Sequence, residues 1–193
     1  MANRYPLVLN GTTVQELQSG DAVTGLIIGT DVQAYDADTA KTDVAQTFTA
    51  LQTFSGSTSV AATKLTNIKE VVTVSATAAT GTINYDVTTQ SVLYYTSNAS
   101  GNFTVNFRGS SGTSLDTLMS TGESISATFL VTNGSTAYYN SAVQVDSSSV
   151  TPKWQGGTAP TSGNVSSIDI YTYVIIKTGS ATFTVLASVT KFA

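Results

Sequence analysis

From Glu70 onward, short runs in which apolar and polar residues alternate recur along the chain, and this pattern most constrains the fold. In residues 102–107, Phe and Val alternate with Asn and Thr, which is the period of a strand with one buried face. Ile168, Ile170, Val174 and Ile176 share one face of a longer predicted strand. About eight such runs fall within residues 70–193, and only residues 114–120 are typical of a helical turn. The spacing predicts a mainly β fold with an antiparallel, jelly-roll-like β-sandwich over residues 70–193.

The surface of this domain is expected to carry hydroxyls rather than charges. Charged residues make up 10% of the 193 residues, against roughly 25% in ordinary soluble domains. Ser and Thr together supply about 30%. Such a surface suits a part of a fixed extracellular or viral assembly, where repulsion between free monomers matters less. An ordinary β-domain with a polar coat has the same composition, so both interpretations stay open.

Charge and composition exclude several partners. The net charge is −4 and the eight basic residues are scattered, so we expect no nucleic-acid partner. The chain has no cysteine, hence no disulfide or thiolate chemistry. Apolar runs such as residues 174–176 are too short to cross a membrane. Residues 5–9 are too short for the apolar region of a signal peptide, so we expect no secretion signal and no membrane insertion.

The N-terminal part has a different organisation. Asn10-Gly11 separates residues 5–9 from residues 12–17 and predicts a β-hairpin with a tight turn. Such a hairpin is too small to be stable alone. It either pairs with the main sheet or attaches the chain to a larger particle, in which case Tyr5, Leu7 and Leu9 are the candidate attachment residues. We assign residues 1–30 to this segment and residues 31–69 to a connector.

The connector contains one predicted helix, at about residues 43–54. Asp43 can cap its start, and Gln46 stands at the position of a capping-box partner. Val44, Phe48 and Leu51 then fall on one face. A helix of about three turns is marginal alone in water. Its apolar stripe therefore needs a cover, which is either its own domain or the same stripe of neighbouring copies.

Three segments carry a resemblance. Residues 39–56 (TAKTDVAQTFTALQTFSG) resemble a linker of tail-fibre and other virion proteins of tailed bacteriophages. Residues 1–9 are similar to the start of many structural proteins of marine phages. Residues 152–160, with residues 168–173 and 181–188, resemble the C-terminal β-domain of those proteins. The resemblance spans most of the chain and is specific to this group, but not to one part of the virion.

The resemblance implies a homotrimer in which Val44, Phe48, Leu51 and Phe54 of three copies bury one another. It also implies a non-enzymatic structural protein on the outer surface of a phage particle. The N-terminal segment would attach to capsid, portal, neck or tail proteins, and the C-terminal β-domain would be displayed as a knob. A capsid decoration or cement protein that clamps capsomers is one alternative. A lectin-like tip that contacts a host surface glycan is the other.

Catalytic and metal-binding motifs are weak. The chain has no histidine, so the common general base is absent. Residues 188–191 match Ser-x-x-Lys and residues 177–179 match Lys-Thr-Gly, but the order is reversed relative to serine β-lactamases. The carboxylates available for glycoside hydrolysis are Asp86, Asp116, Glu123, Asp146 and Asp169, with no further signal. Residues 36–47 match a calcium loop only at their start. We expect no enzymatic activity, no cofactor and no metal.

Three aromatic residues are candidates for a glycan or partner contact. Trp154 is the only tryptophan and lies between Pro152 and Pro160. It can stack on a sugar ring, or it can close one end of the core beneath a loop rich in Pro and Gly. Tyr138 and Tyr139 can form an aromatic patch together with Tyr171 and Tyr173, or all four can serve as ordinary strand residues.

Overall fold

The computed structural model describes residues 7–10, 13–16 and 66–193, and the chain divides into two units, Met1–Lys64 and Leu65–Ala193. In the first unit, β1 (Leu7–Asn10) and β2 (Thr13–Glu16) form an antiparallel hairpin in which Asn10 is in register with Thr13. The predicted N-terminal hairpin is therefore confirmed. The predicted helix at residues 43–54, with Val44, Phe48, Leu51 and Phe54, lies outside the described residues, as does Tyr5. Leu7 and Leu9 are described as backbone of β1.

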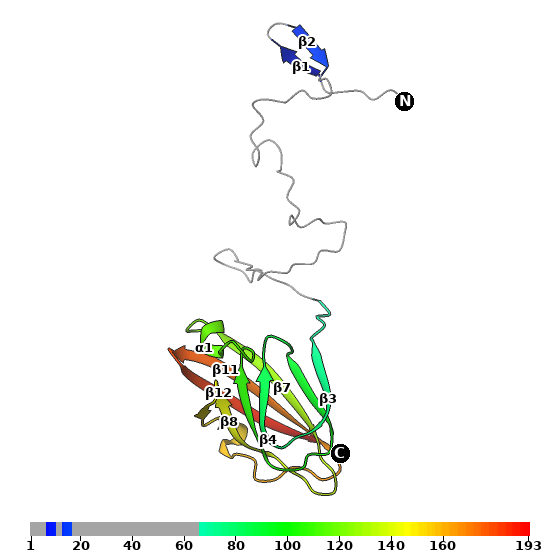
Figure 1. Cartoon of the computed structure of the whole chain (residues 1–193), viewed down its shortest axis with the longest axis vertical. Coiled ribbons are helices and arrows are strands. Elements are labelled where there is room, and N and C mark those ends of the chain that lie inside the picture. Colours follow the sequence, from blue (N-terminus) through cyan, green and yellow to red (C-terminus); the bar gives the residue numbers. More distant parts are fainter. Residues whose placement is uncertain (1–6, 11–12, 17–65) are drawn as a thin grey trace, which may run out of the picture. The chain divides into compact units, whose positions relative to one another are not determined.

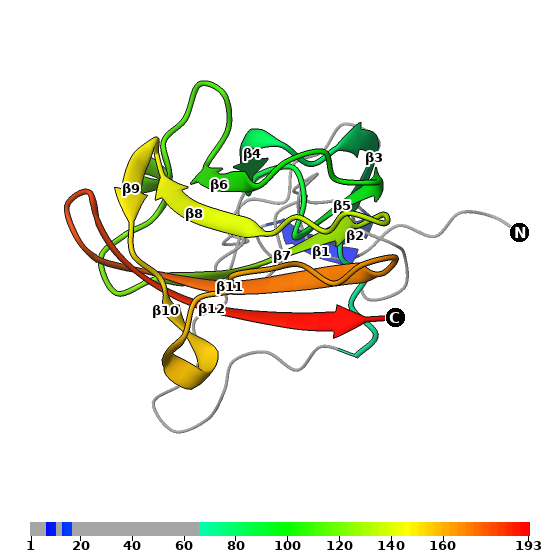
Figure 2. The same cartoon turned by 90° about the horizontal axis from the view of Figure 1, so that it is seen from below.

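The second unit is a β-sandwich of two sheets, drawn edge-on in Figure 2. The six-stranded sheet has the order β10-β12-β11-β7-β5-β3, and the four-stranded sheet has the order β4-β6-β8-β9. The elements are β3 (Val72–Ala78), β4 (Gly81–Asp86), β5 (Val92–Ser97), β6 (Phe103–Arg108), α1 (Leu115–Leu118), β7 (Ser124–Thr132), β8 (Asn140–Val145), β9 (Ser148–Val150), β10 (Lys153–Trp154), the 3₁₀ turn Gln155–Gly157, β11 (Ile168–Gly179) and β12 (Thr182–Phe192). The mainly β fold and the helical turn within residues 114–120 are confirmed.

The prediction that the sandwich is antiparallel is wrong for most of its strand pairs. Along the chain, successive strands from β3 to β8 alternate between the two sheets, so that β3, β5 and β7 are parallel neighbours in one sheet. In the same way, β4, β6 and β8 are parallel neighbours in the other. Antiparallel pairing is confined to β7 with β11, β11 with β12, and β8 with β9 in this unit. The reason is that short connections cross between sheets, which puts every second strand in the same direction.

The dipeptide Asn133-Gly134 shows most clearly the difference between the predicted and the observed strand pairing. The sequence there predicts a tight hairpin, but β7 and β8 on either side of it lie in different sheets. Asn133 is buried, and its side chain accepts a hydrogen bond from the backbone N of Tyr138 (3.0 Å) and donates one to Asp169 Oδ2 (3.1 Å). The residue therefore holds a loop between the sheets instead of forming the turn of a hairpin.

The core lies between the two sheets and is rich in aromatic rings. As the alternation predicts, Phe103, Val105 and Phe107 of β6 are buried. Phe103 contacts Phe129 and Tyr171 edge-on at centroid distances of 5.5 and 5.8 Å, and Phe107 contacts Tyr173 at 4.9 Å. Edge-on contacts of this kind contribute beyond the apolar area that they bury. The core thus joins β6 of one sheet to β7 and β11 of the other.

Candidate functional site

Trp154 lies at one edge of the six-stranded sheet, where the short strand β10 runs parallel to β12. The positive φ angles of Gly156 and Gly157 (77° and 79°) turn the chain directly after it. The indole ring is half-buried and contacts Tyr171 and Tyr173, each at 6.4 Å between ring centroids. Trp154 therefore has a structural role, because its ring packs against the hydrophobic core.

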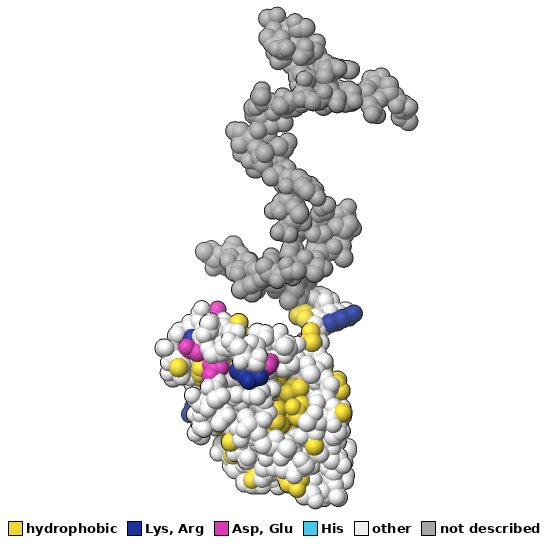
Figure 3. Space-filling view, in the orientation of Figure 1, with side chains coloured by type: hydrophobic (Ala, Val, Ile, Leu, Met, Phe, Trp, Pro, Cys, Tyr) yellow, Lys and Arg dark blue, Asp and Glu magenta, His cyan; other side chains and the backbone are white. Residues whose placement is uncertain are grey.

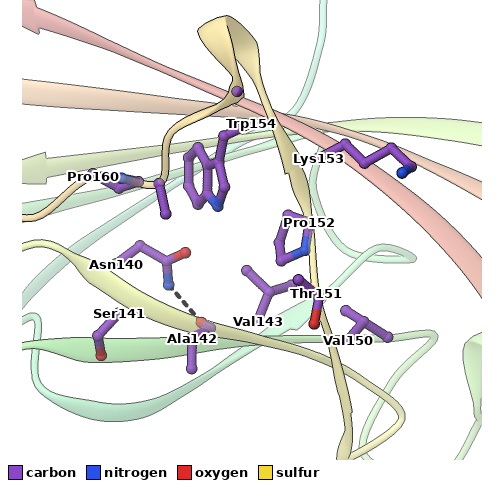
Figure 4. A pocket seen from close by; sticks show the side chains of 12 residues that line it. Asn140, Ser141, Ala142, Val143, Val150, Thr151, Pro152, Lys153, Trp154 and Pro160 are labelled. Atoms are coloured by element: carbon purple, nitrogen blue, oxygen red, sulfur yellow. Dashed lines mark hydrogen bonds between the residues drawn. The ribbon is translucent and has the colours of Figure 1, made fainter.

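A groove of about 560 Å³ opens beside this ring (Figure 4). Trp154 lies between Pro160 and Pro152, above Asn140 and Val143 of β8. The remaining lining comes from β8, from residues 150–153, which run from the end of β9 into β10, and from the loop after β10. This volume is within the range of small-molecule sites. Tyr138 and Tyr139 precede β8 and do not line the groove, so the structure does not gather the three predicted aromatic residues at one site.

The amide of Asn140, at the base of the groove, is fully engaged within the protein. Its Nδ2 donates to the carbonyl oxygens of Phe103 (3.1 Å) and Ala142 (2.7 Å), and its Oδ1 accepts from the hydroxyl of Tyr173 (3.2 Å). Burial raises the pKa of the Tyr173 hydroxyl, which therefore stays protonated and remains a donor. Asn140 is thus a structural bridge between the sheets rather than a free group of the groove.

Several charged side chains lie close together near α1, and Figure 3 shows this group on the face that it draws. Asp86 pairs with Arg108 (2.5 Å), and Asp116 pairs with Lys177 (2.8 Å). The Asp146 carboxylate accepts the backbone N–H groups of Leu115 (2.6 Å) and Asp116 (2.9 Å) at the start of α1. Glu123 accepts the N–H of Ser120 (2.7 Å). These carboxylates therefore stabilise turns and pair with basic side chains within the fold.

Asp169 is the fifth carboxylate and lies buried on the inward face of β11. Its Oδ2 accepts from Asn133 Nδ2 (3.1 Å) and from the backbone N of Asn164 (3.0 Å), whereas Oδ1 has no hydrogen-bond partner. Burial raises the pKa of this carboxyl, and these two hydrogen bonds and the charge of Lys191 offset only part of the effect. Within residues 66–193, no three His, Cys, Asp or Glu side chains gather at one site that could hold a metal ion.

A second candidate surface is the outer face of the six-stranded sheet. On β11, Asp169, Tyr171, Tyr173, Ile175 and Lys177 are buried, and the alternate residues point outward. The residues predicted to share a face, Ile168, Ile170, Val174 and Ile176, do so, and that face is the outer one. In register across the sheet lies the row Val74, Tyr94, Leu130 and Ile170, from β3, β5, β7 and β11.

This outer face is apolar or hydroxyl-bearing throughout. Its apolar members are Val72, Val74, Val92, Tyr94, Leu130, Ile168, Ile170, Val174, Ile176, Leu186 and Phe192. The other outward positions of β3, β5, β7, β11 and β12 hold Ala, Ser or Thr, and none holds a charge. Lys153 on β10, in register with Leu186, is at the rim. An exposed sheet face usually carries polar residues, so this one is an exception.

Sequence reasoning missed this surface as a candidate site, although the sequence carries its signal. Residues 92–95 and 168–176 are apolar at both even and odd positions, which is the pattern of a strand covered on both faces.

The described part of the chain holds no helix long and apolar enough to cross a membrane. Comparisons of the chain with protein-family models, with curated proteins and with solved structures find no match.

Proposed function

We propose that this chain is a non-enzymatic structural subunit of a tailed-phage virion, a trimeric component resembling a fibre or spike. Its N-terminal segment would attach to another virion protein, and the unit Leu65–Ala193 would be the displayed β-domain. The observation that carries the proposal is the uncharged, apolar outer face of the six-stranded sheet. Apolar patches of this kind mark surfaces that meet another protein.

The sequence supplies the rest of the support. Residues 39–56 resemble the linker of phage fibre proteins, and they hold the stripe Val44, Phe48, Leu51 and Phe54. Three copies of a short apolar stripe around one axis bury each other at about 1.5–3 kcal/mol per large side chain. Three residues of the weak catalytic motifs, Asp116, Asp146 and Lys177, stabilise the fold at α1, which fits a structural role.

The location is tested by labelling intact particles. An antibody raised against the unit Leu65–Ala193, coupled to gold, is expected to decorate purified virions at fixed positions in electron micrographs. Decoration of the tail or neck supports a fibre, whereas an even lattice of label over the capsid supports the cement alternative instead. Absence of the chain from purified virions by mass spectrometry would refute both.

The oligomeric state is tested on the full chain. Light scattering is expected to give three times the monomer mass of 20.0 kDa. Phe48→Asp places a charge in the helix stripe and is expected to weaken the trimer. Asp38→Asn, an exchange in the connector outside the stripe, is the control and should leave the mass unchanged. A monomer at high concentration would contradict the proposed assembly.

A second candidate function, the glycan-binding tip, is favoured by one observation. The half-buried Trp154 ring lines a groove of about 560 Å³ between two prolines, and an aromatic face of this kind stacks on the apolar face of a sugar. It ranks second because the side-chain amide of Asn140 is already hydrogen-bonded within the protein and is not free to bind a sugar. Titration with neutral mono- and disaccharides while the single tryptophan's fluorescence is recorded tests it, and no change with any sugar would remove it.

A further inference from the structure

We infer that the outer face of the six-stranded sheet is an interface between copies of this chain. The inference deepens the proposed function by naming the partner of this face, and it rests on that proposal only for the expected number of copies. The face consists of the outward side chains of β3, β5, β7, β11 and β12, with the row Val74, Tyr94, Leu130 and Ile170 across its middle.

The first argument is exposure. Val74 is 64% exposed, and Leu186 and Phe192 at the other side of the face are 41% and 53% exposed. Between them, Tyr94, Leu130 and Ile170 are partly exposed. Removing such side chains from water stabilises a complex by roughly 25 cal/mol per Å² of apolar surface. Residues 66–193 of one copy leave this stabilisation unused.

The second argument is charge. Identical copies bring identical charges together, and like charges placed across an interface cost several kcal/mol. The outward positions of these five strands hold no charge at all. On β11, both charged residues, Asp169 and Lys177, point inward instead. Copies of this face therefore meet without repulsion and without the burial of an unpaired ion.

The third argument is size. With strands about 4.8 Å apart and a rise of about 3.4 Å per residue, the face is about 19 Å wide and about 27 Å long from Ile168 to Ile176. A contact over this footprint removes on the order of 500 Å² from each copy, and about 1,000 Å² in total is what a specific interface needs. The face is thus large enough for a contact between copies by itself.

Crosslinking gives a direct test, because the chain has no native cysteine. In the full chain, Ile170→Cys is expected to form a disulfide between copies under mild oxidation and to be protected from a maleimide before dissociation. Thr82→Cys is the matched control, since Thr82 is exposed on β4 of the other sheet. It is expected to react freely with the maleimide and to give no crosslinked dimer.

A charged variant supplies the second readout. Ile170→Lys is expected to raise the concentration at which the oligomer dissociates by about tenfold or more, since the lysine must be desolvated in the contact. Thr82→Lys should leave that concentration unchanged, and circular dichroism should show that both variants fold. An oligomer that resists Ile170→Lys and gives no Ile170→Cys crosslink would overturn the inference while leaving the fibre proposal in place.

The remaining outcomes also decide the question. A monomeric chain in which Ile170→Cys is protected would show that the chain covers its own sheet, and a monomer in which it reacts would assign the face to another protein. Both overturn the inference. Conversely, if the crosslink forms but virions lack the chain, the interface stands and the virion proposal fails.

Discussion

The ammonium group of Lys177 lies 2.8 Å from Oδ1 of Asp116 and also donates to the carbonyl oxygens of Asp116 (2.6 Å) and Met119 (2.9 Å). One buried cation from β11 therefore satisfies the carbonyl groups of Asp116 in α1 and of Met119, the residue that follows α1, and also holds the Asp116 carboxylate. This contact ties the only α-helical turn of residues 66–193 to the long strand β11.

Removing this cation should destabilise the unit. Lys177→Met keeps the length of the side chain but removes the donor to the two carbonyl groups and the cation that pairs with Asp116, which keeps only the N–H of Ala181. Hydrogen bonds to charged groups contribute roughly 1.5–3 kcal/mol, so we expect a loss of about 2–3 kcal/mol in the free energy of unfolding in urea. Lys69→Met, at an exposed lysine, is the control and should change little. Equal effects of the two variants would show that Lys177 does not hold α1.

The pH dependence of stability should differ in sign between two carboxylates. The pKa of Asp169 is raised by burial, so its contribution to stability is complete below the unfolded pKa near 3.8 and is lost as pH rises through the folded pKa. Asp169→Asn is therefore expected to gain stability relative to the native chain as pH rises above 3.8. Urea unfolding at a series of pH values from 3 to 7 measures this difference, and parallel curves would contradict it.

Asp116 supplies the opposite case. The hydrogen bonds from Lys177 and from the backbone of Ala181 lower its pKa, so its contribution is present above the unfolded value near 3.8 and is lost as pH falls through the folded pKa. Asp116→Asn is expected to flatten the acid side of the stability curve. A steep acid limb that persists in this variant would assign the loss to other groups.

Tyr173 and Asn140 should behave as one buried unit. Tyr173→Phe removes the hydroxyl that donates to Asn140 Oδ1 and leaves that oxygen unpaired between the sheets. A buried unsatisfied acceptor costs about 1–3 kcal/mol, and urea unfolding followed by circular dichroism measures it. Tyr94→Phe on the outer face is the matched control and should be close to neutral. If both variants unfold at the same urea concentration, the bridge is of no energetic consequence.

Trp154 should contribute to stability through its contacts with Tyr171 and Tyr173. Trp154→Ala is expected to lower the free energy of unfolding by about 2–3 kcal/mol, less than the ~3–5 kcal/mol for a fully buried large aromatic residue. Trp154→Phe keeps a ring in place and should lose less. Thermal unfolding followed by circular dichroism separates the two, and an unchanged midpoint for Trp154→Ala would leave only a binding role for the indole.

Local sequence patterns correctly predict several strands and their buried faces. Alternation at residues 102–107 predicts Phe103, Val105 and Phe107 as one buried face, and they are buried. Asn10-Gly11 predicts the N-terminal hairpin, and β1 and β2 form it. Both signals are local, because side-chain direction along a strand and turn conformation depend on neighbouring residues only.

Strand direction, sheet membership and the outer face depend on contacts between distant parts of the chain, and local patterns do not predict them. Side-chain alternation is the same in parallel and antiparallel strands, so it could not reveal that β3, β5 and β7 run parallel. Ile168, Ile170, Val174 and Ile176 share a face in either arrangement. On the opposite face of the strand, Tyr171, Tyr173 and Ile175 fill the core because the four-stranded sheet packs there. The position of that sheet is set by contacts between residues far apart in the chain.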